Sequence, residues 1–285
     1  MTDEKLTLEH KDLLHARLKN AGTSLSEYSF ANLYLFREVH DYHVALLPEG
    51  VFIRGRAYDG SRFLMPTEKV REDQAEAVLG LLNDGEYLFP VPEEWLPAFD
   101  GKKVSLESSE DDSDYIYTTE KLSTYKGPRL HGQKNLLNQF LSQFTPEARP
   151  LTQDRLADAL EILEVWQTNM GKERTATDYF PCREAFECYD ELVLCGGIYY
   201  VANEPAGFII GEEVHPDMFA LHFAKGKRKF KGLYQYMYNH FAKILPRQYA
   251  YLNFEQDLGK FALRIAKSSY DPERTLKKYR VRPVI

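Results

Sequence analysis

The stretch GGIYYVANEPAGFIIGEEVHPDMFALHFAKG, residues 196–226, decides the fold class of this chain. Its β-branched and aromatic residues form three short runs. The turn formers Asn-Glu-Pro at 203–205 and His-Pro-Asp at 215–217 separate these runs. The stretch therefore predicts three consecutive antiparallel strands.

Helical periodicity flanks this block of strands on both sides. In the helix expected upstream, Leu156, Leu160, Leu163 and Trp166 recur at a spacing that places them on one face. The second half is expected to contain helices over 152–170, 186–195, 232–245 and 258–270, a strand over 249–255 and an irregular or strand-like tail over 271–285.

The first half repeats this mixture of element types. A turn at Pro48-Glu49-Gly50 predicts a hairpin over 42–56, and the other expected elements are helices over 6–20, 68–84 and 134–144 and a strand at the end of 107–118. The segment TPEARP at 145–150, with a proline at each side, is typical of a domain boundary. We therefore expect an α+β protein of two domains, 1–148 and 149–285, with mixed, mostly antiparallel sheets.

Composition limits the partners and the compartment. The 285 residues carry 36 Lys+Arg against 43 Asp+Glu, a formal net charge of −7, which argues against coating of nucleic acid and leads us to expect no DNA partner. Cys182, Cys188 and Cys195 fit no zinc or redox spacing, so we expect no metal and a reducing, cytoplasmic location. The N-terminus lacks the apolar core of a signal peptide, and no segment approaches the ~18 apolar residues of a membrane span.

A concentrated basic segment, KGKRKFKG at 225–232, follows the strand block and precedes a helix. Unpaired N–H groups at a helix N-terminus, the partial positive charge there and permissive glycines together suit a phosphate. This pattern predicts a donor-binding loop that includes Lys225, Gly226, Lys227, Arg228 and Gly232. The alternative interpretation is a solvated charged turn that promotes solubility.

Four segments resemble one soluble bacterial family: SFANLYLF at 29–36, DYIYTTEKLSTYKGPRLHGQKNLLNQF at 114–140, LHFAKGKRKFKGLYQYMYNHFA at 221–242 and YLNFEQDLGKFALRIAKSSYDP at 251–272. The family is similar to the C-terminal domain of phosphatidylglycerol lysyltransferases, with two GNAT-like (N-acyltransferase-like) domains in tandem. The resemblance implies a degenerate first domain and a site in the second. It also implies acyl or aminoacyl transfer with no tightly bound cofactor, and with acyl-CoA or aminoacyl-tRNA as co-substrate.

Candidate catalytic groups cluster after the basic segment. Asn253, Glu255 and Asp257 alternate, so a strand that continued to Asp257 would present all three on one face. Glu255 could act as a general base beside a donor held by Asn253. Asp257 is better suited to cap the helix that follows.

Several further side chains are candidates with weaker signals. His222 could serve as a base and Tyr270 as the proton donor to a leaving group, although a role in the core is the alternative for each. For the first-domain candidates named below, the alternative to a role in the site is a position on the solvated polar face of a helix. The further candidates are His222 and Tyr270 in catalysis, Tyr234 and Gln235 in donor binding, and His131 and Lys134 in the first domain.

The sequence thus predicts an acyltransferase. It would move an acyl or aminoacyl group from a phosphate-bearing donor, either aminoacyl-tRNA or acyl-CoA, to an amine or hydroxyl. The alternative is a non-catalytic protein of the same fold that binds RNA or a nucleotide. A carboxylate and a tyrosine that converge on the basic segment would favour the enzyme.

Overall fold

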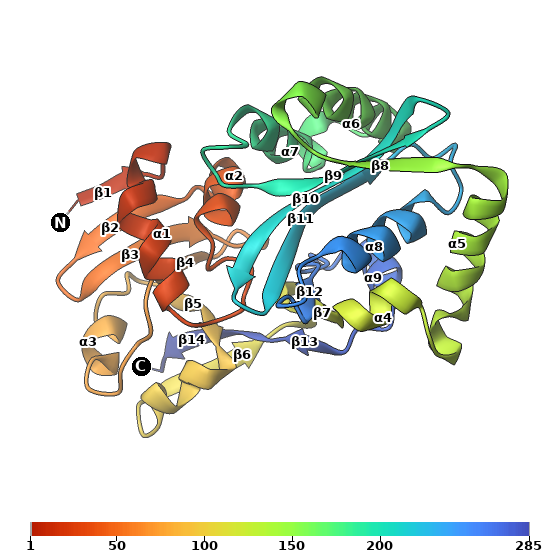
Figure 1. Ribbon diagram of the computed structural model, residues 1–285. Helices are drawn as coiled ribbons and strands as arrows, with labels where there is room; N and C mark the ends of the chain where they lie inside the picture. The colour runs from red at the N-terminus through yellow and green to blue at the C-terminus, as the bar shows by residue number, and fades with distance from the viewer. Residues whose placement is uncertain (1, 285) are drawn as a thin grey trace. The chain divides into compact units, whose positions relative to one another are not determined.

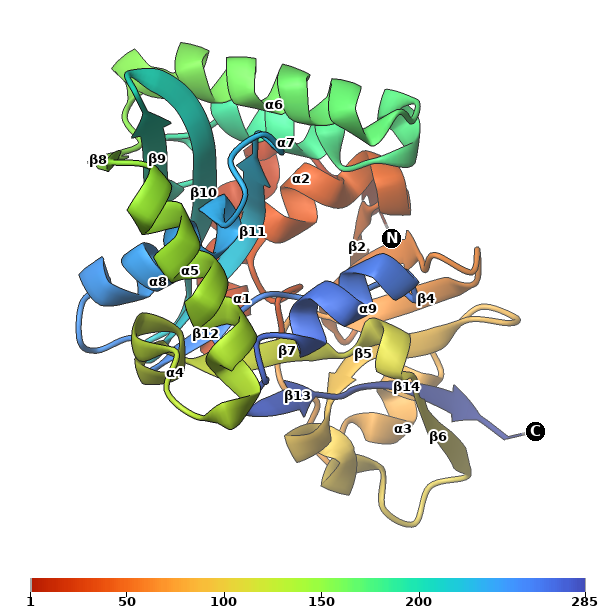
Figure 2. The ribbon, with the colours of Figure 1, turned by 90° about the vertical axis from the view of Figure 1, so that its right-hand side faces the viewer.

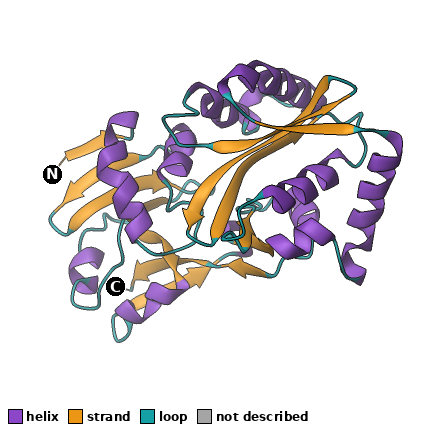
Figure 3. Cartoon of the chain, in the orientation of Figure 1, coloured by secondary structure: helices purple, strands orange, loops and turns teal. Residues whose placement is uncertain are grey.

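The computed structural model describes residues 2–284, and its strands form two seven-stranded sheets (Figures 1 and 3). The chain divides into two compact units. Unit 1 comprises the chain up to Asp114 together with Gln256–Leu263 and the segment from Thr275 onward, whereas unit 2 comprises Tyr115–Glu255 and Arg264–Arg274. Helices accompany strands in both units, which confirms the α+β class.

The sheet of unit 1 has the strand order β1-β2-β3-β4-β5-β14-β6. β4 and β5 pair in parallel, and the other neighbours in this sheet are antiparallel. The C-terminal strand β14 therefore lies between two strands from the N-terminal part of the chain. The elements are β1 Thr2–Lys5, α1 Lys11–Asn20, α2 Phe30–His40, β2 His43–Leu47, β3 Gly50–Arg56, β4 Arg62–Pro66, α3 Ala75–Leu79, β5 Tyr87–Pro92, β6 Val104–Ser108 and β14 Lys278–Pro283.

The second sheet has the strand order β13-β7-β12-β11-β10-β9-β8. β8 to β11 pair as antiparallel neighbours, whereas β11 and β12 are parallel. The elements of this part are β7 Asp114–Thr118, α4 Thr119–Thr124, α5 His131–Gln143, β8 Pro146–Pro150, α6 Leu156–Met170, α7 Tyr179–Glu187, β9 Cys195–Val201, β10 Glu204–His215, β11 Met218–Gly226, α8 Leu233–Ile244, β12 Tyr251–Asn253, α9 Phe261–Ser268 and β13 Arg274–Leu276.

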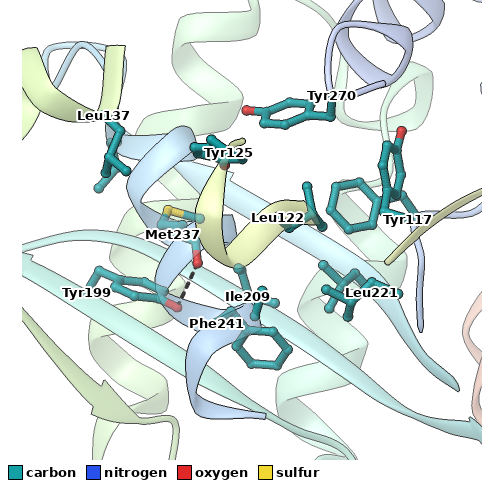
Figure 4. Packing of buried hydrophobic residues seen from close by; sticks show 14 of the residues in the cluster. Tyr117, Leu122, Tyr125, Leu137, Tyr199, Ile209, Leu221, Met237, Phe241 and Tyr270 are labelled. Atoms are coloured by element: carbon teal, nitrogen blue, oxygen red, sulfur yellow. Dashed lines mark hydrogen bonds between the residues drawn. The ribbon is translucent and has the colours of Figure 1, made fainter. Parts of the chain in front are cut away.

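Helices cover both faces of the long strands in unit 2. α6 and α8 each contact β10 and β11, and the two views show them on opposite sides of these strands (Figures 1 and 2). Beneath α8, Met237 and Phe241 belong to a buried cluster in which the Tyr199 hydroxyl donates to the Met237 carbonyl at 3.3 Å (Figure 4). This core fixes α8 on the sheet and thereby fixes the loop that precedes it.

The strand block that decides the fold class is confirmed. Residues 196–226 form β9, β10 and β11 in antiparallel order, and the expected turns fall between them. The helix expected over 152–170 is α6, and the helix expected over 232–245 is α8. Alternation, turn residues and helical spacing were sufficient here because each is a local property of the chain.

Two predicted helices differ from the structure, and one observed helix was not predicted. The helix expected over 68–84 shrinks to α3, and the helix expected over 186–195 is instead α7, which ends at Glu187. α2 was not predicted, although its N-cap signal is visible: the Ser29 hydroxyl accepts from the Asn32 N–H at 3.2 Å. A capping serine before an apolar run is a helix start that the sequence analysis did not use.

The observed division of the chain differs from the expected domains 1–148 and 149–285. TPEARP is the edge strand β8, hydrogen-bonded to β9, and α5 before it belongs to unit 2. Prolines suit an edge strand because one of its sides needs no N–H donors, so this composition does not distinguish an edge from a linker. Between residues 2 and 284, no helix is long and apolar enough to cross a membrane.

Candidate active site

The candidate site in unit 2 begins where β11 and β12 stop pairing. Their parallel register covers only Met218–Ala220 against Tyr251–Asn253, and β11 continues to Gly226 after β12 has ended. Glu255 has a φ of 58°, and the Asn253 side chain accepts a hydrogen bond from the Glu255 N–H at 2.7 Å. This turn ends the strand, so the expected alternation of Asn253, Glu255 and Asp257 on one strand face is wrong.

His222 on β11 lies between two carboxylates. Its Nδ1 is 2.7 Å from Oε1 of Glu255, and its Nε2 is 2.9 Å from Oε1 of Glu212 on β10. The imidazole is 0% exposed, the Glu212 side chain 9% and the Glu255 side chain 14%, so Glu255 is the member of the group that solvent reaches most. We call these three residues the carboxylate–histidine group.

The two carboxylates determine the charge of His222. Burial lowers the pKa of His222, but the hydrogen bonds and negative charges of Glu212 and Glu255 outweigh burial and raise it to about 10. Both ring nitrogens then donate, because an ionised carboxylate can only accept. An imidazolium has no lone pair for a proton, so in this arrangement His222 is not the general base that the sequence suggested.

Two lysines of the predicted donor loop are already paired within unit 2. Nζ of Lys225 is 2.6 Å from Asp178 and 3.8 Å from the ring centroid of Trp166. Nζ of Lys227 is 2.6 Å from Glu161 and 2.8 Å from Glu204. Both lysines are buried, so their charges hold α6 and the start of α7 against the loop rather than face solvent.

The rest of the loop has the expected strand-to-helix geometry. β11 ends at Gly226, whose N–H donates to the Tyr234 hydroxyl at 3.0 Å, and α8 starts after Gly232. Arg228 and Lys231 are exposed. Any anion at this junction would therefore meet the exposed cations Arg228 and Lys231, together with Lys229, whose ammonium is 2.6 Å from Glu204.

Tyr270 lies in a buried polar chain rather than at an open surface. Its hydroxyl accepts from Nε2 of Gln235 at 3.1 Å, and the same amide donates to Gln133 at 2.9 Å. Gln133 in turn donates to the Ser269 hydroxyl at 2.8 Å. Tyr125 and Tyr117 lie near the Tyr270 ring (Figure 4), and burial together with these tyrosines raises the pKa of Tyr270 well above its ordinary value. This geometry favours a structural role for Tyr270.

The remaining candidates are not members of the carboxylate–histidine group. His131 and Lys134 are exposed on α5, which belongs to unit 2 and not to an N-terminal domain. Asp257 does not cap α9, since its carboxylate accepts from the Gly259 N–H at 2.8 Å and the helix starts at Phe261.

Sequence reasoning missed Glu212 and Asp178. Glu212 directly follows the apolar run FIIG at 208–211, and an acidic residue in a buried strand is a signal of a charged partner. No comparable signal marks Asp178, whose lysine partner lies 47 residues further along the chain.

Unit 1 contains a separate acidic cavity. It has a volume of about 280 Å³, and Tyr58, Asp59, Asp112 and Arg280 contribute to its lining. Arg280 donates to both aspartates, at 2.6 and 3.0 Å. None of the candidate site residues lines this cavity. Within residues 2–284, no cluster of three or more His, Cys, Asp or Glu side chains is arranged to hold a metal ion.

Comparison with known proteins identifies the family. The model of the family described as "Phosphatidylglycerol lysyltransferase, C-terminal" matches residues 19–282, so the chain belongs to this family. An uncharacterised protein of Mycoplasmoides gallisepticum is 23% identical over 197 residues, which cover 67% of this chain and 62% of the length of that relative.

Solved structures support the fold. A conserved protein of unknown function from Bacteroides thetaiotaomicron is 24% identical, with 99% of each chain covered and a TM-score of 0.84. L-PGS from Bacillus licheniformis is 14% identical, with 98% of this chain and 92% of that chain covered and a TM-score of 0.60. The matches extend over nearly the whole chain, in agreement with the expected α+β architecture of two mixed sheets.

Proposed function

We propose that this protein transfers an aminoacyl group from aminoacyl-tRNA to an amine or hydroxyl acceptor, with Glu255 as the general base. Family membership supports the reaction class. The observation that carries the proposal is the partly exposed Glu255 carboxylate at the point where β11 and β12 separate, held by the imidazolium of His222.

The charge of the site favours an aminoacyl donor over a plain acyl donor. The carboxylate–histidine group contains two carboxylates and one imidazolium, and the nearby Lys267 ammonium is held by the Phe254 and Glu255 carbonyl oxygens. A partly buried negative charge attracts the ammonium of an aminoacyl group, and an acyl chain of coenzyme A has no such cation. Acyl-CoA remains the second donor to be tested.

The proton transfer balances with Glu255 as base. The acceptor N–H or O–H gives its proton to the Glu255 carboxylate while its nitrogen or oxygen bonds to the donor carbonyl carbon. The ester C–O bond then breaks, and the protonated Glu255 gives its proton to the leaving ribose oxygen. This transfer restores the Glu255 carboxylate. Glu255 must therefore be ionised before each transfer.

Glu255→Gln tests this role. We expect donor affinity to persist while turnover falls by roughly 10²–10⁴, the range for loss of an acid–base group. Transfer is measured with radiolabelled aminoacyl-tRNA or acyl-CoA and a mixture of amine and hydroxyl acceptors. Glu213→Gln is the matched control. Glu213 follows Glu212 on β10, but its carboxylate accepts from the Tyr249 hydroxyl at 2.6 Å and does not bond to His222.

Binding at several salt concentrations separates the donors. Affinity for a tRNA, which has many phosphates in contact, falls steeply between low and physiological salt, whereas coenzyme A has a shallow dependence. Binding of RNA without transfer, in the wild type and in Glu255→Gln alike, would instead establish a non-catalytic binding protein.

A further inference from the structure

Glu212 is a buried acidic residue in the middle of a strand. It lies on β10 directly after Ile209, Ile210 and Gly211, with a residue exposure of 7%. Removal of a carboxylate from water costs several kcal/mol unless a positive partner and hydrogen bonds compensate. The imidazole of His222 lies 2.9 Å from its carboxylate and supplies such a partner when protonated.

We propose that Glu212 is a positioning residue for the transfer reaction: it holds His222 as a doubly donating imidazolium and so fixes the orientation of the Glu255 carboxylate. This inference rests on the proposed function of Glu255. Glu212 acts through His222, because each ring nitrogen binds one of the two carboxylates.

The argument follows from the hydrogen-bonding capacity of imidazole. A neutral ring has one donor and one acceptor, and it can satisfy only one ionised carboxylate. Two ionised carboxylates on opposite nitrogens therefore require the cation, and they also fix the plane of the ring. Without the Glu212 charge, nothing requires the second ring proton. A neutral ring then becomes accessible whose Nδ1 is either donor or acceptor, so it no longer always donates to Glu255.

Other ionisable groups near the pair do not replace Glu212. Lys267 on α9 donates to the backbone carbonyl of Glu255 at 3.0 Å, and an ammonium cannot accept a hydrogen bond from the imidazolium. Cys195 on β9 interacts electrostatically with Glu212. Between them, Glu212 on β10 and Glu255 after β12 supply the two negative charges that bond the ring.

Glu212→Gln is the direct test, because it keeps the size and an acceptor oxygen but removes the charge. We expect the donor KM to change less than about twofold and kcat to fall roughly ten- to hundredfold, as for loss of an outer partner of a reacting group. In the wild type, we expect no change in activity from His222 titration between pH 6 and 9, because the ring stays protonated over this range. In the variant, activity falls as pH rises through this range.

The protonation of His222 is observed directly by NMR of protein with labelled histidine, with the His222 signal assigned by its absence in His222→Gln. The wild type keeps both ring protons up to pH 9, whereas Glu212→Gln lowers the titration of His222 into the measured range. Glu213→Gln leaves both the titration and kcat unchanged.

A double-mutant cycle tests whether Glu212 acts through His222. The double variant Glu212→Gln/His222→Gln should turn over at the rate of His222→Gln alone, because the path to Glu255 is already lost. Additive losses, an unchanged His222 titration in Glu212→Gln, or turnover equal to that of Glu213→Gln would each overturn the positioning role. Absence of transfer by the wild type would instead contradict the proposed function, and the NMR titration would still decide the positioning role.

Discussion

At the scale of single residues, the surroundings decide what a titratable side chain can do. His222 and Lys225 are a base and a phosphate ligand by residue type alone. In the fold, His222 is an imidazolium between Glu212 and Glu255, and Lys225 is bound to Asp178 beneath the Trp166 ring. A buried charge is retained where a partner of opposite sign is close enough to offset its desolvation.

The charge of His222 predicts a pH dependence of stability. The pKa of His222 rises from its ordinary 6.5 in the unfolded chain to about 10 in the fold, so its contribution is fully present below pH 6.5 and is lost as pH rises through 10. We expect the unfolding free energy of the wild type to fall more steeply over that range than the unfolding free energy of His222→Gln. Urea denaturation at pH 6, 8 and 10 measures both, and parallel slopes would contradict the assigned charge.

At the scale of elements, the junction between β11 and α8 depends on the close approach of α5 to Gly232. Gly232 precedes α8 with a φ of 90°, which is in the left-handed region. A Cβ atom there would lie 2.4 Å from the Leu136 carbonyl oxygen and 2.8 Å from Cβ of Phe140, both on α5. The glycine therefore allows α5 to pack directly against the start of α8.

Gly232→Ala should destabilise the protein by more than about 1 kcal/mol, because backbone strain and a clash with α5 add. Gly127→Ala is the matched control: its φ is 104°, yet an added Cβ meets nothing within 4 Å. Thermal or urea unfolding of both variants separates the two effects. Equal losses of stability would show that the contact with α5 is unimportant and that only the backbone conformation matters.

At the scale of the whole molecule, the chain leaves unit 1 and later returns to it. β14 lies between β5 and β6, and Lys278 at its start is fully buried. Nζ of Lys278 is 2.7 Å from Glu27 and 2.6 Å from Asp114. Two carboxylates from the N-terminal part of the chain thus share one ammonium from the C-terminal strand.

Lys278→Met should cost roughly 3–5 kcal/mol of unfolding free energy, because it leaves two buried carboxylates without their cation. Lys277→Met is the control, since Lys277 is exposed on the neighbouring position. Hydrogen exchange should show the largest loss of protection in β5, β6 and β14. A variant as stable as the control would mean that the cluster does not hold the C-terminal strand in place.

The sequence alone determined the features that depend on neighbouring residues. Alternation and turn residues define β9, β10 and β11, and the basic segment with its two glycines places a strand-to-helix junction at 226–233. Four recognisable segments also identified the family, because such segments retain their order in the chain. These are local signals, and no knowledge of distant contacts is needed to interpret them.

Only the tertiary structure decided the partners of the charged groups and the course of the chain between units. Glu255 lies 33 residues from His222, and Glu27 lies 251 residues from Lys278, so no spacing rule connects either pair. The same applies to β8, whose prolines look like a linker until β9 pairs with it. The charge state of a side chain and the sheet to which a strand belongs depend on which segments lie next to each other in space. For His222, Lys278 and β8, packing of the whole chain determines these neighbours.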